Sequence, residues 1–333
     1  MNAQAPTTGV ETAIAHALRL LDSNPAAAAR QARELLKAAP GHPGAVLLLG
    51  MAATAERDFA HAIAVLEPLV RVQPKSARAW LALGMARAGG GQQAPAVDAL
   101  NRAIALQPGL PCAWLGLADL RFAAGDEDGA NAAYLEHVRL SHQDQELMGA
   151  AAALAQNRLP DAERMLRQRL KWQPGDVAAM RMLAELCLRL GRNEEALGLL
   201  ERALERAPGF DAARQNYAVV LNRGNRFDEA LAELQALLDK DPGNQVLKNM
   251  KAVVQGKLGD FDSAIATYES VLQRVPDQAE IWINYGHALK TAGRATEAVA
   301  AYRRCVELQP AFGAAWWSLA NLKTVRFDAG DIA

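Results

Sequence analysis

Prolines and alanines recur at intervals of 34 residues along most of this 333-residue chain. The repeating prolines are Pro40, Pro74, Pro108, Pro174, Pro208, Pro242, Pro276 and Pro310. The repeating alanines are Ala62, Ala96, Ala130, Ala162, Ala196, Ala230, Ala264 and Ala298, and a third series is Trp80, Trp114, Trp282 and Trp316. All three series share the 34-residue period and a single two-residue deletion. The chain is therefore built from internal repeats.

One period, from Ala77 to Leu110, predicts two helices separated by a glycine turn. Trp80, Leu83 and Gly84 share one face of the first helix. The helix ends at Gly89-Gly90-Gly91, because glycine can adopt the positive φ that terminates a helix, and Gly125, Gly191, Gly259 and Gly293 keep this register. The second helix stops before Pro108. Alanine at position 20 of every repeat predicts a close crossing of the two helices.

A single helical hairpin cannot bury its apolar face, so stacked copies predict an all-α solenoid. The period and its residues resemble the tetratricopeptide repeat, which implies a right-handed superhelix of stacked helix–turn–helix hairpins. We expect a disordered tail over 1–8, nine repeats over 9–312, a final helix over 313–327 and a second tail over 328–333. The repeats start near residues 9, 43, 77, 111, 145, 177, 211, 245 and 279. The repeat from Gln145 is two residues short and alanine-rich, which predicts a local change in curvature.

Composition argues against several classes of partner. The net charge is −1 and the pI about 6.6, which is unlike a nucleic-acid groove or a surface for anionic membranes. The sequence has no apolar run of about 18 residues, and residues 1–10 do not form a signal peptide. Cys112, Cys187 and Cys305 are odd in number and far apart, so we expect apolar filler in a reducing, cytoplasmic protein.

The sequence shows no catalytic constellation. The six histidines lack metal-ligand spacing with a carboxylate, and of the two closest, His137 occupies a core position and His142 replaces the repeat proline. Gly89-Gly90-Gly91 lacks the Gly-Lys-Ser/Thr ending of a phosphate-binding loop and follows a helix. We therefore predict no catalytic residue, metal site or cofactor site in this chain.

Binding is expected on the face of each first helix that does not pack. Positions 4, 7, 8 and 11 pack, so positions 2, 6, 9 and 13 point the opposite way. In tetratricopeptide arrays that face lines a concave groove, so the resemblance implies a protein or peptide partner there. The candidate residues are Asn216, Arg223, Met250, Lys257, Asn284, His287, Lys290, Ser318 and Asn321.

Asparagine is suited to this role because its side chain both donates and accepts hydrogen bonds, so it can bind a peptide backbone of any sequence. Asn216 and Asn284 lie two periods apart, which resembles the asparagine ladder of the O-linked N-acetylglucosamine transferase array. The alternative is that these residues are solvated polar side chains on an exposed face.

The last predicted helix leaves Trp317, Leu322 and Val325 without a following helix to cover them. One interpretation is that the natural chain continues past Ala333 into another domain, which could itself occupy the groove. The other is a stand-alone adaptor or assembly factor without enzymatic activity, in which this edge forms a homodimer.

A second resemblance favours the first interpretation. Three segments resemble the bacterial tetratricopeptide-repeat sulfotransferases: 174–185, 282–294 and 316–327. This implies that the array recruits a substrate or partner for a downstream catalytic domain, with 3′-phosphoadenosine 5′-phosphosulfate as the expected cofactor. None of that domain's residues lies in this chain, so no catalytic role is assigned.

Overall fold

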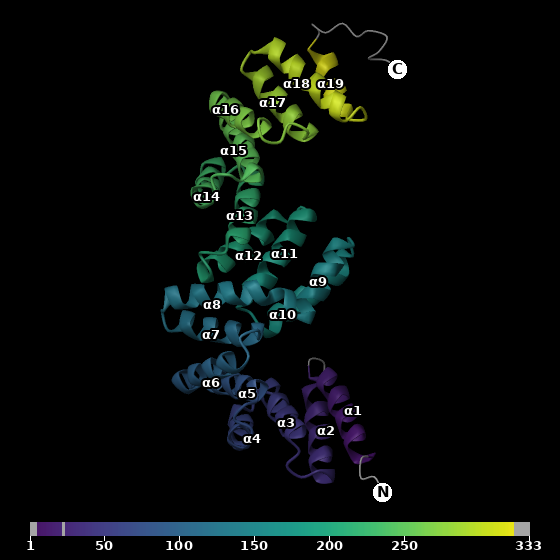
Figure 1. The fold of residues 1–333 in the computed structure, drawn as a ribbon, viewed down its shortest axis with the longest axis vertical. Coiled ribbons are helices and arrows are strands. Elements are labelled where there is room, and N and C mark those ends of the chain that lie inside the picture. The colour runs from purple at the N-terminus through teal and green to yellow at the C-terminus, as the bar shows by residue number, and fades with distance from the viewer. Residues whose placement is uncertain (1–4, 22–23, 323–333) are drawn as a thin grey trace. The chain divides into compact units, whose positions relative to one another are not determined.

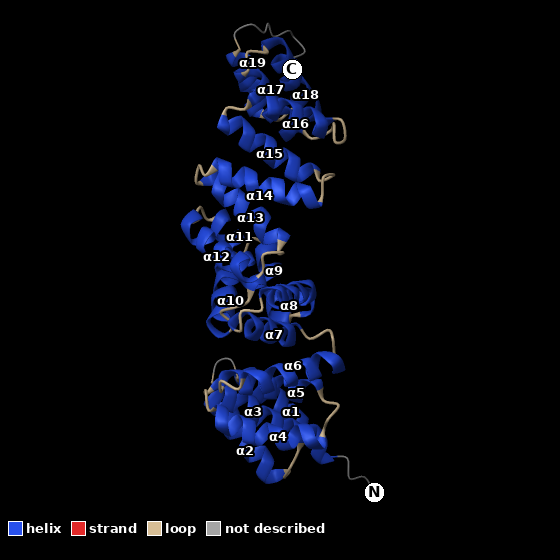
Figure 2. Ribbon diagram, turned by 90° about the vertical axis from the view of Figure 1, so that its left-hand side faces the viewer, coloured by secondary structure: helices blue, strands red, loops and turns tan. Residues whose placement is uncertain are grey.

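The computed structural model of the protein describes residues 5–21 and 24–322 (Figure 1). Within these ranges it contains nineteen α-helices, one short 3-10 helix and no strand (Figure 2). The prediction of an all-α solenoid of helical hairpins is confirmed. None of the described helices is both long enough and apolar enough to span a bilayer.

The chain divides into two compact units, residues 1–183 with 202–209 and residues 184–201 with 210–333. Unit 1 contains α1 (Ala5–Leu20), α2 (Pro25–Ala38), α3 (Pro43–Ala55), α4 (Phe59–Val72), α5 (Ala77–Gly89), α6 (Gln93–Leu106), α7 (Pro111–Ala123), α8 (Glu127–Leu140), the 3-10 helix η1 (Ser141–Gln143), α9 (Gln145–Ala155) and α10 (Leu159–Trp172). The division passes through α11 (Val177–Arg189) and α12 (Asn193–Arg206). Unit 2 contains α13 (Asp211–Arg223), α14 (Phe227–Lys240), α15 (Gln245–Leu258), α16 (Phe261–Leu272), α17 (Ala279–Thr291), α18 (Ala295–Leu308) and α19 (Gly313–Asn321).

The turn inside each hairpin from α3 to α18 places one residue at positive φ. These residues are Arg57, Gly91, Gly125, Asn157, Gly191, Asn225, Gly259 and Gly293. Five are the glycines that the sequence predicts, and the two asparagines tolerate the left-handed region better than most residues. The next residue begins the second helix, where the carboxylates of Asp58, Asp126 and Asp260 each accept a backbone N–H.

The close helix crossings are confirmed. All eight alanines at position 20 are fully buried. Position 8 of the facing first helix is glycine in three repeats, where an added Cβ would lie less than 3 Å from the side chain opposite. The facing pairs are Gly50 with Leu66, Gly84 with Leu100, and Gly286 with Tyr302.

Each repeating tryptophan is tied to a repeating proline. The indole Nε1 donates a hydrogen bond to the carbonyl of the proline six residues earlier, at 2.9, 2.9, 2.7 and 2.8 Å for Trp80, Trp114, Trp282 and Trp316. This bond explains why the two residue types share one period. All four rings are only partly buried. Truncation to alanine should therefore cost less than the roughly 3–5 kcal/mol that the sequence suggests for a fully buried tryptophan.

The two ends of the chain and the shortened repeat can be compared with the boundaries predicted from the sequence. The tail predicted over 1–8 is too long, because α1 already begins at Ala5. The two-residue deletion falls within α9, which has 11 residues where α7 has 13. The predicted change in curvature there stays a prediction. The final helix is described as far as Asn321, and its predicted extension to residue 327 lies outside the described residues.

Candidate binding surface

The candidate surface lies on the first helices of unit 2. We call it the first-helix surface and define it by Asn216, Val219, Asn222, Asn249, Met250, Val253 and Asn284 on α13, α15 and α17. Between α13 and α15 it contains a pocket of about 110 Å³. Val219 and Asn222 line the pocket from α13, and Asn249, Met250 and Val253 line it from α15.

This surface carries amide atoms that have no hydrogen-bond partner. Asn216 Nδ2, Asn222 Oδ1 and Asn249 Oδ1 are enclosed by protein, and no described residue bonds to them. Buried polar atoms are nearly always paired, since an unpaired one costs the free energy of its lost hydration. The three asparagines are themselves only half-buried, and an amide group both donates and accepts hydrogen bonds.

The structure brings only some of the predicted residues together. Met250 lines the pocket, and its Sδ lies 3.8 Å from the amide Nε2 of Gln215. Asn216 and Asn284 are half-buried on the same surface. Arg223 and Lys257 are engaged elsewhere: the Arg223 guanidinium donates to the Leu188 carbonyl, and Lys257 Nζ lies 5.5 Å from the centre of the Phe227 ring.

The predicted residues nearer the C-terminus lie in different environments and do not form one site. His287 Nδ1 lies 2.9 Å from the Tyr302 hydroxyl, and burial together with the charge of Lys290 lowers the pKa of His287. Lys290 and Asn321 are exposed. Ser318 is a correction: it is only 2% exposed, because it faces the core and its hydroxyl donates to the Ala314 carbonyl one turn earlier.

The predicted terminal edge is described in part. Trp317 is 67% exposed, whereas Leu322 packs partly buried against the apolar core of α15–α19. Val325 lies outside the described residues. Homodimerisation through this edge stays a prediction.

Unit 1 contains a cluster of buried charges around the shortened repeat. His137 Nδ1 donates to the Pro111 carbonyl at 3.1 Å, and its Nε2 donates to Asp176 Oδ1 at 3.0 Å. Arg169 bridges three acids, with Nε 2.9 Å from Asp176 Oδ2, Nη2 2.8 Å from Asp144 Oδ2 and Nη1 2.7 Å from Oε2 of the exposed Glu146. His137, Arg169, Asp144 and Asp176 are all at most 9% exposed. We call these four residues the buried charge cluster.

The contacts of the buried charge cluster fix its ionisation. Burial opposes a charge on His137, but the hydrogen bond from this ring to the Asp176 carboxylate raises its pKa. Burial likewise disfavours ionised Asp176, yet the bond and charge of His137, with the charge of Arg169, lower its pKa to about 2. Burial raises the pKa of the neighbouring Cys112 thiol, so this cysteine is not an activated nucleophile. The four residues are buried and their charges are paired, with Arg169 also bonded to the exposed Glu146, which indicates a structural role.

Comparison with known proteins identifies the family. A family model described as the Cilia and flagella-associated protein 70 C-terminal domain matches residues 2–220. Two tetratricopeptide repeat models match residues 188–254 and 249–311. The first of these models matches more than half of the chain. The chain therefore belongs to its family, which is a family of tetratricopeptide repeat domains. The resemblance to tetratricopeptide repeats is thereby confirmed.

Three solved structures that the chain resembles have low sequence identity to it and TM-scores below 0.5. A MamA structure (AMB-1) is 21% identical, with a TM-score of 0.45, over 50% of this chain and 98% of MamA. A chain of the APC/C hetero-tetramer Cut9–Hcn1 is 15% identical, with a TM-score of 0.42, and the match covers 91% of this chain and 53% of that one. YrrB, described as a TPR protein with an unusual peptide-binding site, is 15% identical, with a TM-score of 0.41. The match covers 67% of this chain and 98% of the YrrB chain.

No curated protein matches the chain. None of the matched families and structures named above is described as a sulfotransferase, so that resemblance rests on the quoted residues alone.

Sequence reasoning missed Asn222 and Asn249 on the first-helix surface of this tetratricopeptide repeat domain. They occupy positions 12 and 5 of their repeats, next to the positions that were selected. The exposed face of a helix is wider than the four positions 2, 6, 9 and 13, so the periodicity could have been used to include positions 5 and 12 as well. What the sequence could not show is which amides lack partners, because that depends on neighbouring repeats.

The buried charge cluster predicts a specific pH dependence. The pKa of His137 is raised in the folded state, so its contribution to stability is complete below its ordinary value of 6.5 and is lost as the pH rises through the folded-state pKa. The free energy of unfolding, measured in urea between about pH 6 and pH 9, should therefore fall less in His137→Gln than in the wild type.

His287→Gln is the matched control for this measurement. The pKa of His287 is lowered, so this residue affects stability only as the pH falls below 6.5. The control should keep the wild-type loss at alkaline pH. Equal slopes in the wild type and in His137→Gln would show that His137 is not held as an imidazolium.

Proposed function

We propose that this chain is a scaffold that binds an extended segment of a partner protein along the first-helix surface of unit 2. Tetratricopeptide repeats are protein-interaction modules, and repeat arrays of this kind use extended surfaces for binding. The observation that carries the proposal is the set of half-buried asparagines Asn216, Asn222 and Asn249 on α13 and α15, two of which line the pocket between these helices.

The chemistry of this surface suits a backbone ligand. The three half-buried asparagines lie on α13 and α15 and have amides that donate and accept, and a peptide in an extended conformation exposes unpaired N–H and C=O groups. Between them, Val219, Met250 and Val253 form an apolar floor, and methionine adapts to side chains of different shape. The expected mode is therefore many weak backbone contacts with one apolar anchor.

The test uses peptides selected from a random displayed library on the full chain. Affinity for the selected peptides should fall about tenfold or more in the double variant Asn222→Ala, Asn249→Ala, since each removes bonds to the ligand. Asn101→Ala is the matched control, because Asn101 is an exposed asparagine on the second helix α6. Unchanged affinity in the double variant would reject the first-helix surface as the binding site.

The finer expectations stay predictions from the sequence. These are a downstream sulfotransferase domain with its 3′-phosphoadenosine 5′-phosphosulfate cofactor, a cytoplasmic location, and homodimerisation through Trp317. The reading frame beyond Ala333 tests the first of them. The alternative of a stand-alone adaptor has no structural observation in its favour.

A further inference from the structure

The helix α15 breaks the apolar pattern of the first helices at two core positions. Position 4 is tryptophan in four repeats, but Lys248 stands there in α15. Position 7 is leucine or tyrosine in most repeats, and Lys251 stands there. Both lysines are half-buried. Two cations therefore occupy sites where other repeats place the side chains that pack against the preceding hairpin.

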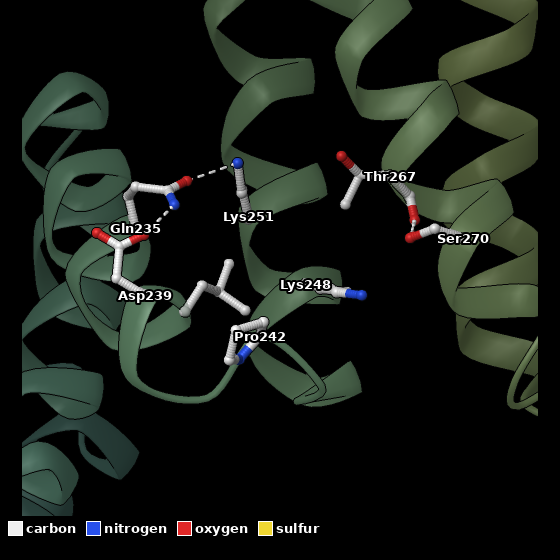
Figure 3. Close-up of a pocket in the computed structure, with 8 residues that line it drawn as sticks. Gln235, Asp239, Pro242, Lys248, Lys251, Thr267 and Ser270 are labelled. Atoms are coloured by element: carbon white, nitrogen blue, oxygen red, sulfur yellow. Dashed lines mark hydrogen bonds between the residues drawn. The ribbon is translucent and has the colours of Figure 1, made fainter.

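A pocket lies beside these two lysines. A space of about 420 Å³ opens beside Lys248 and Lys251, between α14 and α16. Figure 3 shows the two lysines between Gln235 and Asp239 on one side and Thr267 and Ser270 on the other. Pro242 also lines the pocket, and it is the proline whose counterparts accept a hydrogen bond from the tryptophan indole. The size falls within the range of small-ligand sites, which is roughly 300–1,000 Å³.

The positive charge in this pocket is not neutralised by the protein. In the preceding repeat Arg214 holds position 4, and it forms an ion pair with Glu233 at position 23. In α16 position 23 is Thr267, so that carboxylate is missing. Among the described residues Lys251 Nζ donates only to the neutral Gln235 Oε1, at 2.8 Å, and the Lys248 ammonium has neither a hydrogen bond nor an ion pair.

The one acid of the pocket lining is engaged with a neutral group. The Asp239 carboxylate accepts a hydrogen bond of 2.7 Å from Gln235 Nε2 and forms no ion pair with either lysine in the described part of the chain. The lining thus carries two positive charges and one negative charge. An incoming anion would offset this excess positive charge and gain charge-assisted bonds with the two ammonium groups in a partly desolvated site.

We propose that this pocket binds a phosphate monoester carried by a partner protein. Such a group carries about −1.5 to −2 charges and three acceptor oxygens. Lys248, Lys251 and the Ser270 hydroxyl, which now donates to the Thr267 carbonyl at 2.8 Å, supply three donors around the space. A carboxylate has only two acceptor oxygens, against three in the phosphate monoester, and a smaller charge to pair with the two ammonium groups.

This site is separate from the first-helix surface. Positions 4 and 7 of α15 lie on the opposite side of the helix from positions 5, 6 and 9, which carry Asn249, Met250 and Val253. The phosphate site thus does not rest on the proposed function, and either can fail without the other.

The test is isothermal titration of the full chain at constant ionic strength. The probes are inorganic phosphate, acetate, a short phosphoserine peptide of glycine and serine, and its unphosphorylated form. We expect saturable binding of phosphate and of the phosphopeptide, with about tenfold weaker binding in Lys248→Gln and no change in Lys257→Gln, a control on the same helix. Equal binding of acetate, equal binding in Lys248→Gln, or binding of phosphate but not of the phosphopeptide would each overturn the proposal.

A second variant separates binding from folding. Lys248→Trp restores the residue found at this position in four other repeats, and its indole can fill the pocket and donate to the Pro242 carbonyl. The variant should melt at the wild-type temperature or above it while losing phosphate binding. If the Lys248→Trp variant still bound phosphate as the wild type does, the phosphate site would lie outside this pocket. Peptides selected on the first-helix surface should bind Lys248→Trp unchanged.

Discussion

Replacing Asp176 with asparagine is expected to lower the free energy of unfolding by about 3–5 kcal/mol, because it removes one partner from a buried ion-pair cluster. Asp176 Oδ1 accepts from His137 Nε2 and from the backbone N–H of Ala179, while Oδ2 accepts from Arg169 Nε. In asparagine an NH₂ group replaces one of the two carboxylate oxygens. In either orientation of the amide, this NH₂ group would face an N–H donor, from His137 and Ala179 or from Arg169. The guanidinium of Arg169 also loses a buried counter-charge.

Asp126→Asn is the matched control for this prediction. Asp126 caps α8 by accepting the N–H of Gly129, as Asp176 caps α11, but it is exposed. Asparagine also serves as an N-cap, so the cost should stay below about 1 kcal/mol. Urea denaturation followed by circular dichroism measures both variants. Equal losses in the two would mean that the buried charge cluster does not stabilise the fold.

A second measurement follows from the same contact. The raised pKa of His137 depends on its bond to the Asp176 carboxylate. In Asp176→Asn the alkaline loss of stability that this histidine causes should therefore disappear along with the ion pair. A variant that is destabilised but keeps the wild-type slope would assign the loss to packing rather than to charge.

Most of the fold could be predicted because its constraints recur. Ala62 and its seven counterparts are buried for the same reason, a close helix crossing, so the signal is repeated eight times in one sequence. Gly91 and its equivalents repeat the turn in the same way. The series of tryptophans and prolines share a period because one hydrogen bond joins them. Repetition separates such physical requirements from chance.

The features that could not be predicted occur once each and depend on long-range partners. His137 was recognised as a core residue, but its bond to Asp176 spans 39 residues and crosses the only shortened repeat. Lys248 stands at a position that is tryptophan in four other repeats, yet only the structure shows a pocket beside it. The repeat position of Ser318 predicted an exposed side chain on the binding face, but only the structure shows that it is buried.

Replacing Tyr302 with alanine should cost about 3–5 kcal/mol, the range for deleting a fully buried aromatic ring. Tyr302 is 0% exposed, and its ring occupies the space that the missing side chain of Gly286 leaves open. Tyr302→Phe keeps the ring and loses only the contact with His287 Nδ1, so about 1 kcal/mol is expected. Trp317→Ala, at a ring that is 67% exposed, should change stability by no more than about 0.5 kcal/mol.

The location of this damage tests the repeat architecture itself. Each repeat packs chiefly on its neighbours, so the loss should stay near the substituted hairpin. Hydrogen exchange in Tyr302→Ala should accelerate in α16–α19, where the ring belongs to one apolar core, and remain at wild-type rates in α3–α5, which share a different core. Uniform acceleration in both regions would mean that the chain unfolds as one cooperative globule, because only then would a cavity in α18 reach the N-terminal helices.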